Sequence, residues 1–294
     1  MPKTTLCLST TLWLGLCLGV SACADHPVAP TAQSLGAAST PGTSLAATTT
    51  APAANGPELH LVTYNMNYGV AGDRSTVDVV DDATADVILL QETNEVWERA
   101  IRARLGARYP EIRFHSPERL MPGGSGVLSR FPIEAEKVVE SAVGWFPATI
   151  LVVRTDAGPV QIVNVHLRPM VSDSGSWVSG YFTTGHYRET EIAAIRRELD
   201  EGLPTLWAGD FNEAENAGGI SGLGEEGLVS ALPEKAPDAV TWHWNYEGVP
   251  LTQRLDHVLY NRDEFALEDA AVLPGGRSDH FAVRVTLRAR RAAM

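Results

Sequence analysis

Cysteine is absent from residues 24–294, because the three cysteines of the chain are Cys7, Cys17 and Cys23. A domain built from the later residues therefore has no disulfide, no thiolate nucleophile and no cysteine-ligated metal site. We expect such a domain to depend on the packing of its core for stability.

Basic residues are also scarce. The chain has 23 Lys and Arg against 36 Asp and Glu, which gives a formal net charge of −13. A surface of this sign does not attract polyanions over long distances, and this argues against tight, nonspecific binding of nucleic acid. A locally basic cleft remains compatible with the composition.

No apolar run is long enough to span a bilayer comfortably, and the longest covers residues 6–20, after Lys3. This pattern predicts a signal peptide over residues 1–23. The string VSAC resembles the bacterial lipobox, in which the cysteine, here Cys23, becomes the lipidated first residue of the mature protein. The neighbouring Ala22 and Ala24 also allow ordinary cleavage and release. We favour an exported lipoprotein held to a bilayer by an N-terminal acyl anchor and facing the periplasm or the cell surface.

Residues 24–57 are rich in Ala, Thr, Ser and Pro and carry almost no charge. Such a segment buries too little apolar surface to fold, so we expect a disordered tether. Residues 58–290 are long enough for a single α/β domain and contain no internal repeat or linker. Residues 291–294 form a short tail.

The domain alternates apolar segments of strand and helix character, and strands outnumber helices. This mixture predicts an α/β fold with two packed mixed sheets flanked by helices. The predicted strands are 59–64, 87–90, 126–129, 133–139, 149–155, 160–167, 205–208, 255–260 and 281–287, and the predicted helices are 75–84, 95–105 and 187–199.

Six short polar strings follow or begin the predicted strands. They read TYNMN, LLQET, NVHL, AGDFN, RLDHV and SDHF. Strands that end in Asp, Asn, Glu or His place groups that need partners at the rim of a sheet, so we expect one convergent polar cleft.

The order and wording of these strings resemble the endonuclease/exonuclease/phosphatase superfamily of metal-dependent phosphoesterases, over about residues 59–287. The resemblance implies a DNase I-like fold, which is a four-layer α/β/β/α sandwich. It also implies hydrolysis of phosphate esters with Mg²⁺, or with Mn²⁺ as an alternative. No obligate protein partner is evident, and we expect a monomer.

The resemblance further implies a role for each polar residue. The implied metal-site residues are Asn65, Glu92 and Asp279, and the implied catalytic residues are His166, Asp210, Asn212, Asp256 and His280. The hard carboxylate oxygen of Glu92 suits Mg²⁺. Asp256 would orient His280. Whether Asp210 or His280 activates the attacking water remains open.

Several of these residues have simpler interpretations. Glu92 could be a solvated strand end or a helix cap, and Asn65 a turn residue, as could Asn67 in the same string. Asp210 and Asn212 point the same way if their segment is extended, with Phe211 in the core, whereas an Asx turn is the alternative.

Substrate choice should reside in loops. Residues 171–187 are expected to form a long loop, in which Trp177 and Tyr181 are candidate substrate contacts, as is Arg188 directly after it, although the aromatics could instead close the loop on the domain. Arg119 lies in a second rim segment, 115–124. Alternation in the segment that contains Trp242 and Trp244 favours a half-buried strand over a stacking platform.

The pattern therefore predicts a Mg²⁺-dependent phosphodiesterase or nuclease that hydrolyses extracellular phosphodiesters. A phospholipid or inositol-phosphate headgroup hydrolase on the same fold is the alternative. Both remain open, because no long Lys/Arg stretch marks a nucleic-acid groove and no exposed apolar hairpin is evident for membrane insertion. A binding lipoprotein without catalysis is disfavoured, because every motif position holds a competent side chain.

Overall fold

The structure is a computed structural model that describes residues 54–116, 122–246 and 248–290. All described residues belong to one compact unit, within Thr49–Met294. The predicted signal peptide, Cys23 and almost all of the tether lie outside the described residues. Arg119 and the tail 291–294 do so as well.

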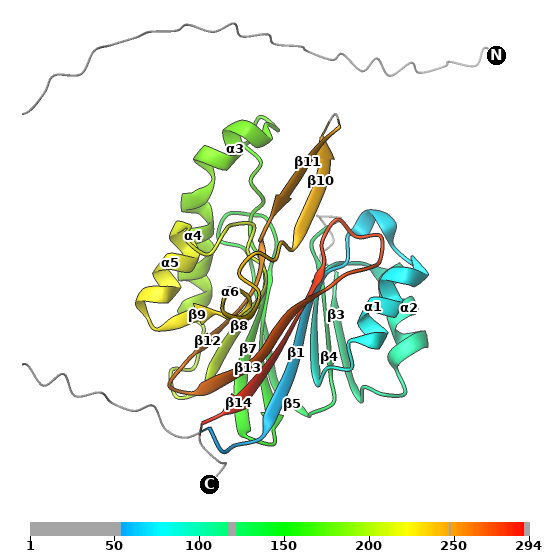
Figure 1. Cartoon of the computed structure of the whole chain (residues 1–294), viewed down its shortest axis with the longest axis vertical. Helices are drawn as coiled ribbons and strands as arrows, with labels where there is room; N and C mark the ends of the chain where they lie inside the picture. Colours follow the sequence, from blue (N-terminus) through cyan, green and yellow to red (C-terminus); the bar gives the residue numbers. More distant parts are fainter. Residues whose placement is uncertain (1–53, 117–121, 247, 291–294) are drawn as a thin grey trace, which may run out of the picture. The chain divides into compact units, whose positions relative to one another are not determined.

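Two six-stranded mixed sheets form the centre of the domain (Figure 1). In spatial order, the first sheet contains β13 (Phe265–Leu273), β14 (Ala282–Ala289), β1 (Glu58–Asn65), β2 (Val87–Thr93), β4 (Gly124–Ser129) and β3 (Glu111–His115). The second contains β5 (Ile133–Val139), β6 (Ala148–Thr155), β7 (Gly158–His166), β8 (Thr205–Asp210), β12 (Asp256–Asn261) and β9 (Leu228–Ser230).

Helices connect the strands around the two sheets. They are α1 (Arg74–Asp82), α2 (Glu95–Leu105), α3 (Trp177–Thr183), α4 (Gly185–Arg196), α5 (Gly218–Glu225) and α6 (Leu232–Lys235), with a short 3-10 helix η1 (Tyr68–Val70). Figure 1 shows α1 and α2 beside one sheet and α4 and α5 beside the other. This arrangement confirms the predicted four-layer α/β/β/α sandwich.

Alternation along the strands explains the layers, because successive side chains of a strand point to opposite faces. Leu61 and Leu89 join the core between the sheets, together with Ile162 from the second sheet. Their neighbours Val62 and Ile88 face α1 and α2 in a separate apolar cluster. The third cluster packs α4 and α5 against the outer face of the second sheet.

Local signals explain where α2 begins and ends. Asn94 accepts hydrogen bonds from the backbone N–H groups of Val96 and Trp97, which caps the first turn. Gly106 follows the last turn, as the sequence predicts. The strand before this helix ends beside the polar residues of the site, so the cap also fixes the chain that carries Glu92.

The predicted loop 171–187 is wrong for most of its length. Ser176 caps α3, and α4 begins at Gly185. Gly180 lets α3 lie close to the preceding chain, because a Cβ there would lie 2.4 Å from the carbonyl oxygen of Met170. Residues 177–183 therefore form a helix that packs against the chain at Met170 and Ser172.

A two-stranded hairpin made of β10 (Trp242–Tyr246) and β11 (Val249–Gln253) stands apart from the two large sheets. The strand predicted at Trp242 and Trp244 is present, but only its first two residues are partly buried, and Trp244 is 51% exposed. The expectation of no exposed apolar hairpin is wrong, since Val249 and Leu251 are exposed as well. Within the described ranges, no helix is long and apolar enough to cross a membrane.

Strand pairing brings the polar strings to one edge. The parallel strands β1 and β2 pair Asn65 with Gln91, and the parallel strands β7 and β8 pair His166 with Asp210. The antiparallel β12 begins at that edge, where Asp256 pairs with Asp210. Strand ends from both sheets thus meet at one end of the sandwich.

Candidate active site

Asn65 joins the two halves of the site. Its amide nitrogen donates to Glu92 Oε1 at 3.1 Å and to Asp210 Oδ2 at 3.0 Å. Its Oδ1 accepts from the backbone N–H of Asn67. One amide group therefore holds a carboxylate from each sheet within hydrogen-bonding distance.

Asp210 is the common neighbour of the site. Its Oδ2 lies 3.6 Å from His166 Nε2 and also 3.6 Å from His280 Nε2. All three side chains are buried. The structure thus gathers the predicted carboxylates and imidazoles around one oxygen atom.

His280 and Asp256 form a close pair, with 2.8 Å between His280 Nδ1 and Asp256 Oδ2. This contact directs Nε2 of His280 toward Asp210 and fixes the tautomer when the ring is neutral. The other carboxylate oxygen of Asp256 is buried without a hydrogen-bond partner among the described residues.

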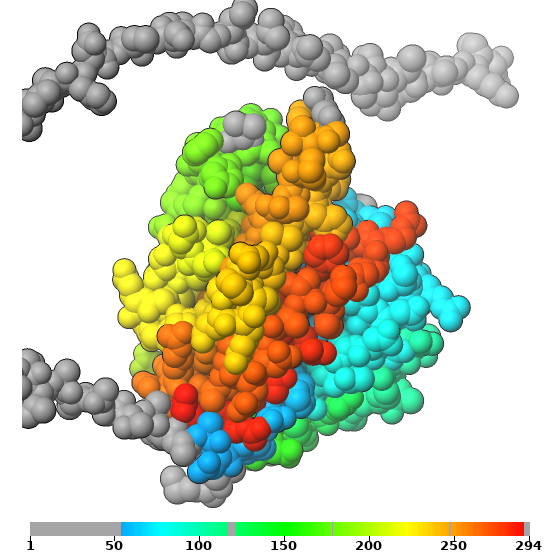
Figure 2. Space-filling model, in the orientation of Figure 1, coloured from blue at the N-terminus to red at the C-terminus, as the bar shows by residue number. Residues whose placement is uncertain are grey.

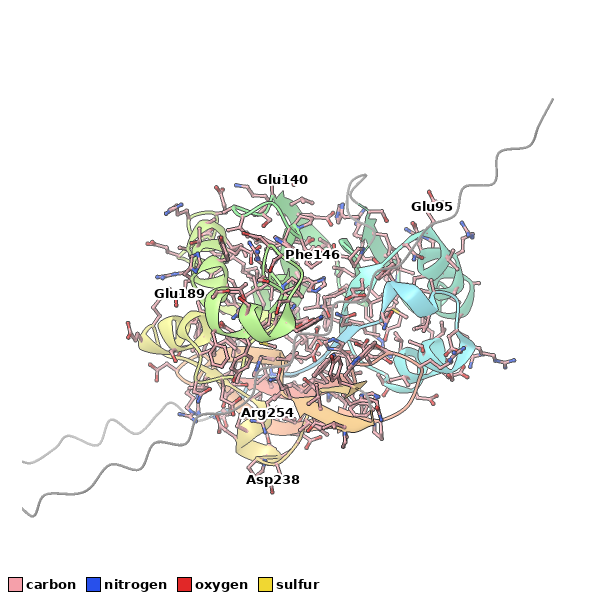
Figure 3. All side chains as sticks on the ribbon, turned by 90° about the horizontal axis from the view of Figure 1, so that it is seen from above. Glu95, Glu140, Phe146, Glu189, Asp238 and Arg254 are labelled. Carbon is pink, nitrogen blue, oxygen red and sulfur yellow. The ribbon has the colours of Figure 1, made fainter. Side chains whose placement is uncertain are left out.

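His166 is held by an aromatic contact. The ring of Phe146 stacks on it with the two centroids 4.0 Å apart. Figure 3 looks down on this end of the domain, with Phe146 near the middle of the view. Because Nδ1 of His166 has no hydrogen-bond partner among the described residues, the stack with Phe146 and the burial of the ring orient the imidazole.

Backbone strain is concentrated at the site. Of the four described non-glycine residues with positive φ, three lie here, and they are Asn67 at 56°, Glu92 at 54° and Asn212 at 51°. Left-handed conformations cost free energy for residues other than glycine and cluster at functional sites. The bulge in β2 that contains Glu92 turns this carboxylate toward Asn65.

Burial and charge alter the protonation of these groups. Burial raises the pKa of Glu92 and that of Asp210. Burial opposes a charged His280, but the carboxylates of Asp256 and Asp210 outweigh it and raise the pKa of His280. Burial and the neighbouring His280 lower the pKa of His166 to about 3, so this ring is neutral at pH 7.

Asp279 has two partners of its own. Its Oδ1 accepts from Asn67 Nδ2 at 2.7 Å, and its Oδ2 accepts from Trp242 Nε1 at 3.1 Å. Asp279 therefore ties the loop after β1 to the start of the hairpin. The role of Asn67 is larger than the turn that the sequence suggested, although the turn is present.

The extended segment expected at Asp210 and Asn212 is wrong. The N–H of Asn212 donates to Asp210 Oδ1 at 2.9 Å, which is the Asx turn of the alternative interpretation. Asn212 Nδ2 also donates to the carbonyl oxygen of Leu167. Phe211 lies in the core as expected.

The donor set fits a divalent cation. Neither Glu92 nor Asp210 forms an ion pair with Lys or Arg among the residues that the structure describes. Uncompensated buried carboxylates are costly, and a cation would relieve that cost. One ligand atom each from Asp210, Asp256 and His280 also lies within 4.8 Å of the others. Mg²⁺ prefers oxygen ligands, which favours the Glu92 and Asp210 side.

The predicted substrate contacts divide into three cases. Trp177 and Tyr181 are each 55% exposed on α3. Arg188 is only 3% exposed, and its Nε donates to Glu213 Oε2 at 3.0 Å, so its prediction as a substrate contact is wrong. Arg119 lies outside the described residues.

The sequence did not predict the contact of Phe146 with His166 or the hydrogen bond from Trp242 to Asp279. Phe146 lies in a loop with no motif around it, so no local signal pointed to a contact with His166. Trp242 carried a signal, since it begins an alternating aromatic segment, but its partner lies 37 residues further along the chain.

Comparison with known proteins extends these observations. The model of the endonuclease/exonuclease/phosphatase family matches residues 62–280. A comparison of the sequence with curated proteins gave no match.

Solved structures show the same fold at low identity. An endonuclease/exonuclease/phosphatase from Beutenbergia cavernae has a TM-score of 0.63 at 20% identity, covering 79% of this chain and 72% of that one. D. rerio TDP2 complexed with a single-strand DNA product has a TM-score of 0.62 at 14% identity, covering 79% and 99%. The human Nocturnin catalytic domain with bound sulfate has a TM-score of 0.59 at 13% identity, covering 79% and 94%.

The family match includes strands of both sheets and the polar side chains of all six strings, and the fold agrees with it. The chain belongs to the endonuclease/exonuclease/phosphatase family.

Proposed function

We propose that this protein is a Mg²⁺-dependent phosphodiesterase, which hydrolyses a phosphodiester to a phosphomonoester and an alcohol. The observation that carries the proposal is the position of the Asn65 amide between Glu92 and Asp210, with two imidazoles 3.6 Å from the same Asp210 oxygen. This cluster offers oxygen ligands, proton acceptors and proton donors in one place.

Glu92, with Asp210 beside it, would hold the cation. When bound, Mg²⁺ would supply positive charge to the phosphoryl oxygens. Asn65 would keep the two carboxylates apart and correctly oriented. Mn²⁺, which accepts similar ligands, is the alternative metal.

Asp210 would orient the attacking water and accept its proton as the new P–O bond forms, and the protonated His280 beside it would stabilise the negative charge that develops. Asp256 holds the ring of His280 through Nδ1. His166, which is neutral at pH 7, would contact the phosphate, and the leaving oxygen would take a proton from solvent water as its bond to phosphorus breaks. Asn212 would support the phosphoryl oxygens with the N–H of its amide that Leu167 does not use.

A nuclease is the favoured form of this activity. The TDP2 neighbour binds a single-strand DNA product, which supports a nucleic-acid phosphodiester as substrate. The exposed hairpin favours a second candidate, hydrolysis of phospholipid or inositol-phosphate headgroups. We further propose that the protein is exported and anchored through Cys23, so that either substrate would be extracellular.

The activity can be tested with the full chain on DNA, RNA, sphingomyelin, phosphoinositides and nucleotide diesters, with Mg²⁺ and with EDTA. We expect turnover of a diester that EDTA abolishes. Asp210→Ala should fold normally, as judged by circular dichroism, and lose most turnover. Asp263→Ala is the matched control, because Asp263 is an exposed carboxylate in a turn away from the site. Turnover by Asp210→Ala close to that of the control would contradict the proposal.

The anchor has its own test. Cys23→Ser should release the protein from the membrane fraction, because the acylated sulfur would be missing. Unchanged fractionation would rule out lipid attachment at this residue. This result would leave the catalytic proposal untouched.

A further inference from the structure

Two tryptophans from separate elements lie nearly parallel beside the active site. The rings of Trp177, on α3, and Trp242, on β10, are inclined by only 19° with their centroids 6.4 Å apart. Two rings that stack on either side of a third ring have centroids about 7 Å apart, since carbon atoms in contact lie about 3.5 Å apart. The observed centroid distance is close to this value.

Trp242 is fixed relative to the catalytic groups. Its Nε1 donates to Asp279 Oδ2 at 3.1 Å, and its backbone forms an isolated antiparallel bridge with His280. Bridged residues have Cα atoms about 5 Å apart. A group stacked on Trp242 would therefore lie next to the position proposed for the scissile phosphate.

Trp177 is the accessible side of the pair, because it is 55% exposed. Figure 2 shows α3 (green) and the hairpin (orange) as neighbouring projections at the same end of the domain. Segments 177–183, 242–246 and 249–253 contain no Asp, Glu, Lys or Arg. The helix and the two strands that carry these aromatic residues thus contribute no charged side chain, in a chain with a net charge of −13.

From this arrangement we propose that Trp177 and Trp242 form a subsite for a nucleobase of the substrate. The inference rests on the proposed phosphodiesterase function and assigns its substrate to the nucleotides. A base is planar and uncharged, and it stands one sugar away from its phosphate. These properties match the near-parallel rings, the lack of charge and the short distance to His280.

The hairpin extends the same surface. Trp242, Trp244 and Tyr246 alternate along β10 and therefore project from one face, about 6.7 Å apart along the strand. Trp244 and Tyr246 are 51% and 60% exposed. This row of rings would accept the bases that follow along a single strand. Stacking does not depend on base identity, so the subsite would tolerate any sequence.

The test compares two phosphates that differ only in the base. Binding of adenosine 5′-monophosphate and of ribose 5-phosphate to the full chain is measured by calorimetry, with Mg²⁺ and with EDTA. We expect the wild type to bind the nucleotide about tenfold more tightly or better. Trp177→Ala should remove this difference and keep the affinity for ribose 5-phosphate.

Phe182→Ala is the matched control, because Phe182 is another aromatic residue of the same helix and its exposed fraction, 79%, is larger than that of Trp177. It should keep the wild-type preference. Equal affinity of the wild type for both phosphates, or no measurable binding of the nucleotide, would overturn the inference. An equal loss of preference in the control would do the same.

A kinetic comparison separates this inference from the proposed function. With a dinucleotide and its abasic analogue, Trp177→Ala should lower kcat/KM about tenfold for the first only. If neither diester is hydrolysed, the proposed function fails while the calorimetry still decides the subsite. If Trp177→Ala weakens binding to phosphatidylcholine vesicles and leaves the nucleotide preference intact, the surface binds lipid and the inference is wrong.

Discussion

A single amide organises the carboxylates of this site. Asn65 is fully buried, and its nitrogen contacts Glu92 and Asp210 while its oxygen accepts from the backbone of Asn67. Two buried carboxylates so close together repel each other unless a donor or a cation lies between them. We therefore expect Asn65 to contribute most to the free energy of unfolding when no metal is bound.

Asn65→Ala should lower the free energy of unfolding by about 1–3 kcal/mol in EDTA, because both carboxylates lose a donor. Added Mg²⁺ should recover part of this loss, since a cation at the carboxylates would offset their repulsion. Thermal unfolding with and without Mg²⁺ measures both effects. A variant as stable as the wild type in EDTA would show that the amide does not stabilise the pair.

Glu191 on α4 supports the loop after His166. Its Oε2 accepts from the backbone N–H of Arg168 at 2.8 Å, and its Oε1 accepts from the hydroxyl of Ser141 at 2.6 Å. Burial raises the pKa of Glu191 above its usual value. The folded state therefore favours the protonated carboxyl more than the unfolded state does.

Glu191→Gln should destabilise the protein by about 1–3 kcal/mol, because the amide offers one acceptor oxygen in place of the two that accept from Arg168 and Ser141. The wild type loses stability as the pH rises from about 4.5 through the raised pKa, whereas glutamine does not titrate. The difference in the free energy of unfolding between the wild type and Glu191→Gln should therefore become smaller from pH 4.5 to pH 7. Urea unfolding at both values measures it, and a widening gap would show that the sign is wrong.

At this scale the sequence predicted which residues meet but not how each is bonded. The polar strings identified Asn65, His166 and His280, which the structure gathers around Asp210. The sequence could not reveal the Asx turn at Asn212, because that turn depends on a positive φ. It also misplaced Arg188, since a buried ion pair with Glu213 outweighed the usual exposure of arginine.

The element that carries Asp210 depends on close backbone packing. In β8, Gly209 has a φ of 142°, and a Cβ there would lie 2.0 Å from the carbonyl oxygen of Val165 on the neighbouring β7. Only glycine fits both constraints. This contact sets the register that places His166 opposite Asp210.

Gly209→Ala should destabilise the protein by about 3 kcal/mol or more, because β7 and β8 must move apart and the backbone is strained. Gly222→Ala is the control, since a Cβ there meets nothing within 4 Å and helical alanine is favoured. Chemical denaturation compares the two variants. If Gly209→Ala and Gly222→Ala are equally stable, β7 and β8 accommodate the added methyl group without a loss of free energy, and the account of Gly209 is wrong.

Elements with strong periodicity were predicted well, and short or exposed ones were not. The strands that contain Leu61, Ile88 and Ile162 alternate between two apolar layers and were correctly predicted. The strand β13 and the helix α5 were missed. The first has a bulge at Leu267 that breaks its alternation, and the second contains four glycines that disfavour a helix in isolation.

Across the whole molecule, polar contacts between the sheets hold the two halves of the site together. Gln91 on β2 donates to Asn164 Oδ1 at 2.7 Å, and Asn164 Nδ2 donates to the carbonyl oxygen of Leu90 at 3.3 Å. Both side chains are buried directly beneath the strand ends. These bonds link the sheet of Glu92 to the sheet of His166.

Asn164→Ala should cost about 1–3 kcal/mol, because Gln91 and the backbone lose buried partners. It should also lower kcat, since the sheets would lose a contact that sets the distance between the halves of the site. Asn216→Ala, at an exposed position, should change neither quantity by much. Denaturation and kinetics on both variants test this, and loss of stability with unchanged kcat would limit Asn164 to a structural role.

The sandwich as a whole followed from composition, alternation and the resemblance of the motifs. The arrangement of α3 and the hairpin did not, because the sequence predicted a loop at α3 and a half-buried strand at Trp244, whereas the fold makes a helix of the first and leaves Trp244 exposed. Exposure of this kind depends on which elements lack a packing partner, and a sequence pattern does not reveal that.

The central claim is that Glu92 and Asp210 bind one divalent cation between the two sheets. The most direct measurement is an anomalous difference map from crystals soaked in Mn²⁺. We predict one peak within about 2.0–2.6 Å of a Glu92 carboxylate oxygen and close to Asp210. A peak elsewhere, or none at these carboxylates under conditions that support turnover, would contradict the account.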